Sequence, residues 1–111
     1  MILKIGEKVH VLNRKQFEDD YTRHFIGVVE DCEGDLMRGV GFLFALECAT
    51  NKYIKYPTPR TRIIHMGDNV VVNVIPQHVD IDKITYTQAP NGDVIVSDGS
   101  DWSLTFTKTL V

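Results

Sequence analysis

The sequence predicts an all-β protein, and three observations support that prediction. Apolar and polar residues alternate over many short segments, which is the period of a half-buried strand. Glycine, proline and asparagine turn signals separate these segments at short intervals, as in small barrels and sandwiches. The chain has 111 residues, the length of one domain with a modest core of its own.

The first strands are predicted in the N-terminal half. Residues 8–12 alternate cleanly, and residues 24–29 do so less cleanly. Residues 39–46 form a near-continuous apolar run, which is typical of a strand that is buried on both faces or strongly bent. Gly39 and Gly41 within this run indicate a bulge or a place where another backbone comes close.

A short N-terminal helix is expected between the first two strands. Asn13 is suited to cap a helix over residues 14–20. Phe17 and Tyr21 would then lie on one face, four residues apart. The alternative is a long hairpin that turns at residues 18–20, and we favour the helix.

The second half of the chain continues the pattern of short strands. Asn91-Gly92 is a strong hairpin signal, and a short turn is expected at residues 79–83. Residues 77–111 are predicted to form a β-rich extension that packs on the same domain as residues 1–76. The strands expected in this half are residues 53–56, 62–65, 70–75, 84–87, 94–96 and 104–107.

Composition places the chain among ordinary globular proteins. Apolar residues make up 43% and charged residues 24%, with a net charge of −3, which is typical of a globular domain. No apolar run has the length of a membrane span, and the first residues do not have the pattern of a signal peptide. We therefore expect a cytoplasmic protein with no membrane partner, in which Cys32 and Cys48 are reduced thiols.

Signatures of catalysis are missing from the sequence. The histidines at 10, 24, 65 and 78 have no paired ligand spacing, and we expect the first three to be strand residues rather than metal ligands. No glycine loop has the context that cradles a phosphate. The expectation is a non-enzymatic protein without metal or cofactor. The least favoured alternative is an enzyme whose catalytic residues are brought together by folding.

The turn Gly67-Asp68-Asn69 lies between two β-branched runs and has two interpretations. Glycine tolerates positive φ, and Asp and Asn tolerate it better than most residues, so the stretch makes a tight turn between two strands without any ligand. Alternatively, the turn belongs to a binding site. An upstream segment favours the second interpretation.

Together the two segments resemble the paired motifs of the Sm/LSm family of small, strongly bent, SH3-like β-barrels. The first motif has a glycine, alternating apolar residues, an acidic residue and then an asparagine four positions later. The second is an apolar strand, Arg-Gly-Asp or Arg-Gly-Asn, and a β-branched strand. The matching positions are Gly41, Leu43, Leu46, Glu47 and Asn51, followed by Ile63, Ile64, Gly67, Asp68, Val70 and Val72. The resemblance covers about residues 24–76.

The resemblance implies an oligomeric ring that binds single-stranded, often uridine-rich RNA. In the family, the strands that flank the second-motif turn pair between neighbouring subunits and close a ring, which leaves no free sheet edge. Asn51 and the Gly67-Asp68 turn would then line the lumen. Two positions depart from the pattern: Ala49 stands where the family has a base-stacking residue, and Met66 stands where it has an arginine. Stacking is worth ~1–3 kcal/mol per base, so both losses weaken family-type recognition.

A basic segment after the first motif offers a replacement. Residues 52–62 interleave four basic residues with two tyrosines and contain no acidic residue, a composition found in surfaces that bind single strands. The alternative is a solvated hairpin whose tyrosines pack on the barrel. The positions we predict for nucleic-acid binding are Asn51, Lys52, Lys55, Arg60, Arg62, Gly67 and Asp68.

The predicted function is therefore a non-enzymatic Sm-like module that forms a homo-oligomer and binds single-stranded RNA, with DNA as the other candidate ligand. The alternative is an Sm-like scaffold for protein interactions that does not bind nucleic acid. The acidic net charge is consistent with this alternative.

Overall fold

In the computed structural model, the described residues are 2–13, 23–47 and 52–106. They form nine strands and one 3-10 helix, and every strand pair is antiparallel. The protein is therefore all-β, as the sequence predicted. No helix in this part of the chain has the length and apolar character needed to cross a membrane.

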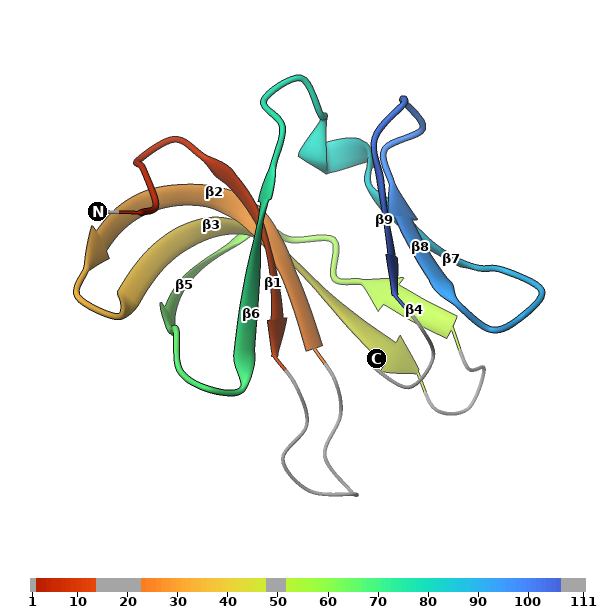
Figure 1. Cartoon of the computed structure of the whole chain (residues 1–111), viewed down its shortest axis with the longest axis horizontal. Coiled ribbons are helices and arrows are strands. Elements are labelled where there is room, and N and C mark those ends of the chain that lie inside the picture. The colour runs from red at the N-terminus through yellow and green to blue at the C-terminus, as the bar shows by residue number, and fades with distance from the viewer. Residues whose placement is uncertain (1, 14–22, 48–51, 107–111) are drawn as a thin grey trace.

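The larger sheet has six strands. β3 is its longest member, and it pairs with two short strands along different parts of its length: β5 with its first half and β4 with its end. The order of the sheet is β4-β3-β2-β1-β6, and Figure 1 shows β2 and β3 as long curved ribbons. The bounds are β1 (Lys8–Asn13), β2 (Arg23–Glu33), β3 (Leu36–Glu47), β4 (Lys52–Lys55), β5 (Arg60–His65) and β6 (Val70–Ile75).

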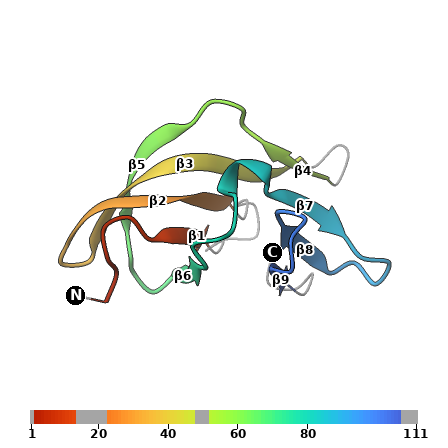
Figure 2. The ribbon, with the colours of Figure 1, turned by 90° about the horizontal axis from the view of Figure 1, so that it is seen from above.

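The smaller sheet comprises the last three strands in sequence order. They are β7 (Thr85–Gln88), β8 (Val94–Ser97) and β9 (Ser103–Phe106), preceded by the 3-10 helix η1 (Ile81–Lys83). The hairpin predicted at Asn91-Gly92 joins β7 to β8, with Gly92 at a φ of 90°. In Figure 2 this sheet lies beside the end of the larger sheet that carries β4.

Alternation along the strands divides the larger sheet into two apolar faces. The inner face is the side on which Val9, Val11, Phe25, Val29 and Met37 gather into one buried cluster. Ile64 of β5 and the valines of β6 at positions 70 and 72 pack against the same cluster. Because strands from both ends of the sheet meet there, the sheet curves around its inner face.

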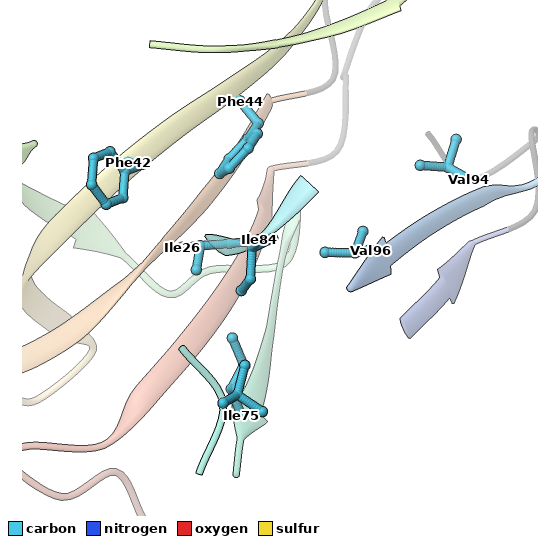
Figure 3. Close-up of a cluster of buried hydrophobic side chains, with 8 residues drawn as sticks. Ile26, Phe42, Phe44, Ile75, Ile84, Val94 and Val96 are labelled. Carbon is cyan, nitrogen blue, oxygen red and sulfur yellow. The ribbon is translucent and has the colours of Figure 1, made fainter. Parts of the chain in front are cut away.

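The outer face is the opposite side, and the smaller sheet covers it. Ile26 of β2 and Phe44 of β3 form a buried cluster there with Val94 and Val96 of β8, and Figure 3 shows β8 presenting its two valines to the larger sheet. Phe44 also stacks on Tyr86 of β7, with ring centroids 4.5 Å apart. The two sheets therefore share one core.

Of the two interpretations of the glycines in the apolar run, a bulge or a close approach of another backbone, the structure shows the close approach at Gly41. Gly27 and Gly41 are register partners on β2 and β3. A Cβ at Gly41 would overlap the carbonyl oxygen of Ile26, which no real side chain tolerates. Gly27 and Gly39 also make room for the Phe25 ring on the inner face. Small residues at these positions allow the two strands to bend together.

Two expectations for short local elements, one at residues 14–20 and one at residues 79–83, have different outcomes. The helix expected over residues 14–20 lies outside the described residues, and Asn13, its expected cap, is the last residue of β1. The described residues themselves contain no α-helix. The short turn expected at residues 79–83 is present as η1, where the Asp80 carboxylate accepts a hydrogen bond from the Asp82 amide.

Candidate nucleic-acid interface

The turn at residues 66–69 does not close a β-hairpin. β5 pairs with β3, and β6 pairs with β1, while β5 and β6 do not pair with each other. The turn therefore carries the chain from one side of the larger sheet to its other edge. The tight turn expected between two strands is present, but these two strands pair with distant partners, which the local sequence does not specify.

The role of Gly67 also differs from the expectation. The Val70 amide donates to the Gly67 carbonyl at 3.1 Å, but Gly67 does not adopt a positive φ. A Cβ at this position would lie 3.1 Å from two atoms of the His65 ring. The glycine is therefore suited to this site because it leaves space beside His65, rather than because of its backbone freedom.

The turn is attached to the loop between β2 and β3. His65 Nε2 lies 2.6 Å from Asp35 Oδ2, and the Met66 amide donates to the Asp35 carbonyl at 2.8 Å. Met66 packs against the inner-face cluster, and Asp68 is exposed. The neighbour of Gly67-Asp68 is thus Asp35, which adds negative charge at this end of the sheet.

Of the predicted lumen residues, the structure describes Gly67 and Asp68. Asn51 and Ala49 lie outside the described residues, but the strand positions on either side are described. Glu47 pairs with Lys52 at the end of β3. Leu36 pairs with His65 at its beginning, next to the Gly67 turn. The two motifs are therefore attached to opposite ends of a 12-residue strand.

The predicted phosphate-binding residues fall into two groups: three exposed side chains, Lys52, Arg60 and Arg62, and one that contacts the rest of the fold, Lys55. Lys52 is exposed. Lys55 is engaged within the fold: its Nζ donates to the Asp82 carbonyl at 2.9 Å and lies 4.0 Å from the centroid of the Phe42 ring. Arg60 and Arg62 are exposed on β5, on the same side of that strand as Ile64 because side chains alternate. Lys55 therefore helps to hold η1 against the larger sheet.

Arg62 lies at the opening of a pocket on the inner face. The pocket has a volume of about 530 Å³ and is lined by residues of β1, β2, β3 and β5, together with Tyr56. Arg23, at the start of β2, lines the same pocket. Neither arginine forms an ion pair with a carboxylate in the described part of the chain. The fold thus brings Arg62, which was predicted as a binding residue, to the same pocket as Arg23, which is far from it in sequence.

Sequence reasoning did not identify Arg23 as part of a site. It is two residues before Phe25, so it shares the inner face of β2. That alternation was visible in the sequence. What was not visible is that β5 would lie across the inner face from it, since both strands reach the pocket through their separate pairing with β3.

A pair of histidines, His10 and His24, is fully buried between the two sheets. His10 Nε2 lies 2.8 Å from His24 Nδ1, and Asn73 Nδ2 donates to His10 Nδ1 at 3.2 Å. His10 Nε2 therefore donates to His24, and the remaining hydrogen of His24 is on its Nε2. Both side chains are 0% exposed. The sequence placed both histidines in strands but did not reveal that they form a pair.

Aromatic rings enclose this histidine pair. Tyr53, Tyr86 and Phe106 lie with ring centroids 5.0–5.7 Å from that of His24. Burial lowers the pKa of His10 to about 4, and burial together with the nearby His10 lowers that of His24 to about 3. Burial also raises the pKa of Tyr53 to about 12. The whole group is therefore neutral at pH 7.

This group has few side chains that suit a metal. Two histidines and two phenols provide only two good ligands for a transition metal. Among the residues that the structure describes, no three His, Cys, Asp or Glu side chains gather as candidate ligands. His24 Nε2 and the hydroxyls of Tyr53 and Tyr86 are buried without a hydrogen-bond partner in that part of the chain.

The fold and the pocket define an all-β protein of two packed sheets with a cationic opening on its inner face. No protein-family model, curated protein or solved structure matches this chain. What the chain does must therefore be argued from its own residues.

Proposed function

We propose that this protein is a non-enzymatic, Sm-like module that binds single-stranded nucleic acid, with RNA preferred, and assembles into a homo-oligomeric ring. The observation that carries the proposal is the pair Arg23 and Arg62 at one opening, with Arg60 on the same side of β5. Tyr56, 45% exposed, adds an aromatic ring at this opening. Cations beside an exposed aromatic side chain suit a phosphate backbone with unstacked bases.

The arrangement of strand edges supports the ring. Within the described residues, β5 pairs only with β3 and β6 only with β1, so each strand has one free edge. Ile63 on β5 is 65% exposed and Val74 on β6 is 54% exposed. Pairing of β5 with β6 of a neighbouring copy would satisfy both edges and cover apolar side chains. The proposal includes a cytoplasmic location, in keeping with Cys32 as a buried free thiol.

The proposed surface differs from that expected of the family. Met66 contributes to the inner core and is not available as the base-sandwiching arginine would be. Lys55 is held by η1. We therefore assign binding to the β5 side of the inner opening, through Arg23, Arg60 and Arg62, with Lys52 as a further contact, rather than to Asn51, Gly67 and Asp68.

Salt-dependent binding tests this proposal. Anisotropy of a labelled oligouridine would be measured against the full chain at several salt concentrations. For single strands the slope of log K against log salt is about −0.7 per phosphate contact. The double variant Arg60→Gln/Arg62→Gln should reduce the slope by about 1.4, whereas Arg38→Gln, an exposed arginine on β3 outside this opening, is the matched control.

Two results would contradict the proposal. One is no binding of the oligouridine near physiological salt, and the other is the same slope for the double variant and the wild type. A mass of a single 12.6 kDa chain by light scattering would reject the ring separately. A ring without affinity for nucleic acid would favour the second candidate, a scaffold for protein interactions, which the exposed apolar residues on β5 and β6 also suit.

A further inference from the structure

The inner-face pocket has the form of a small-molecule site. Its volume of about 530 Å³ is within the range of ligand pockets in proteins, about 300–1,000 Å³. Such sites have mostly apolar walls and a few polar groups that fix the orientation of the ligand. The lining of this pocket is divided in that way.

The floor of the pocket is apolar and buried. Val11 is 2% exposed and Phe25 is 4% exposed, and both belong to the inner-face cluster and line the pocket. Leu43 and Ile64 add two half-buried side chains. These walls offer contact to an apolar body and no charged group.

The rim of the pocket is polar and cationic. Asn13 and Arg23 are cross-strand neighbours at the adjoining ends of β1 and β2. Arg62 and Tyr56 also belong to the polar lining, as do His24 and His65. The only described acidic residue that pairs with a lining residue is Asp35, which is bound to the exposed His65. An arginine fork matches the geometry of a carboxylate or a phosphate.

From this division we infer that the inner-face pocket binds a small amphipathic anion, with its apolar body on Phe25 and its carboxylate or phosphate head on Arg23 and Arg62. Burial of the apolar body removes its surface from water, which supplies most of the affinity. The head remains at the rim, where the two guanidinium groups bind it and water still reaches it. This inference does not depend on the proposed nucleic-acid binding.

The contributions of the ligand's apolar body and of its anionic head can be tested separately by calorimetry with the full chain. Decanoate and decyl phosphate would be titrated below their micelle-forming concentrations, decanol below its solubility limit, and acetate over the same range. Both ten-carbon anions should bind. Decanol lacks the charge and acetate lacks the apolar body, so each should bind at least about tenfold more weakly. The ratio of decanoate to decyl phosphate shows which head group the rim prefers.

Variants locate the site. Arg62→Gln should weaken decanoate about tenfold, whereas the control Arg38→Gln should not change it. Ala45 lines the pocket at the end of β3, so Ala45→Phe should fill the space and abolish binding. Because that variant could disturb the fold, Ala45→Leu and a circular dichroism spectrum accompany it, and the smaller side chain should give a smaller loss.

Amide shift mapping on the unmodified protein gives an independent result. Decanoate should shift the amides of Val11, Phe25 and Leu43 and leave those of Val94 and Val96 in the smaller sheet unchanged. No heat with either ten-carbon anion, or shifts confined to the smaller sheet, would overturn the inference. Decanoate binding without oligouridine binding would support this site and reject the proposed function, and the converse result would do the opposite.

Discussion

The two faces of the larger sheet use the same strands in opposite ways. On the outer face, His24 and Ile26 of β2 are closed off from water by the smaller sheet, and the polar groups there are neutral. On the inner face, Phe25 of the same strand leads to Arg23 at an open pocket. A charge in a sealed interior is costly, whereas a charge at a wet rim is not. The covered outer face can therefore hold only neutral polar groups, whereas the open inner face can hold a charged arginine.

The largest expected effect on stability comes from a substitution that disrupts the packing of β2 on β3 and thereby both faces of the sheet. Gly41→Ala places a Cβ against the backbone of Ile26 and Gly27, where neither strand can retreat without losing its pairing. We expect a loss of at least about 3 kcal/mol in the free energy of unfolding, from overpacking and displaced backbone, measured by urea denaturation.

Gly39→Ala is the matched control for this substitution. Its Cβ would lie 3.1 Å from the edge of the Phe25 ring, a side chain that can adjust, so we expect a loss of about 1 kcal/mol. Equal losses for the two variants would show that the close approach of β2 and β3 is not what shapes the sheet.

An intermediate effect is expected on the outer face as the pH falls. In the unfolded chain a histidine has a pKa near 6.5, while His10 and His24 in the fold have pKa values of about 4 and about 3. Below pH 6.5 the unfolded chain therefore binds protons that the folded chain does not. From pH 7 to pH 6 the free energy of unfolding should fall by about 1.4 kcal/mol for the two histidines together, and it should continue to fall at lower pH.

Urea denaturation at pH 7, 6 and 5 measures this effect. His24→Phe should halve the dependence on pH, because one buried titrating group remains. His78→Gln is the control: His78 is exposed beside Asp101 and should leave the dependence nearly unchanged. A stability that is constant from pH 7 to pH 5 would mean that the outer face is not sealed.

The smallest effect is expected at the turn that leads from β5 to β6. His65 and Asp35 lie 2.6 Å apart, but their side chains are 64% and 65% exposed. Exposed ion pairs contribute about 0–1 kcal/mol. Asp35→Asn should therefore change the free energy of unfolding by less than about 1 kcal/mol, again by urea denaturation. A larger loss would show that this turn, rather than the core, holds the inner face closed.

Much of the local structure was predictable because alternation and turn chemistry are properties of neighbouring residues. β6 has the bounds expected from its β-branched run, and the Asn91-Gly92 hairpin is present. The run around Gly41 correctly predicted a strand buried on both faces, since Phe42 and Phe44 reach the outer cluster while Leu43 packs on the inner one. These features need no information about distant strands.

By itself, then, the sequence determined the β-class and the approximate positions of the strands, and it limited the glycines of the apolar run to a bulge or a close backbone approach. Only the tertiary structure decided which residues meet: His10 with His24 across 14 positions, His10 with Asn73 across 63, and Arg23 with Arg62 at one pocket. It also placed the Gly67 turn near Leu36, at the beginning of β3, whereas the first motif continues past Glu47 at the other end of that strand. The physical reason is that alternation assigns a side chain to a face, whereas the register of distant strands assigns its neighbours.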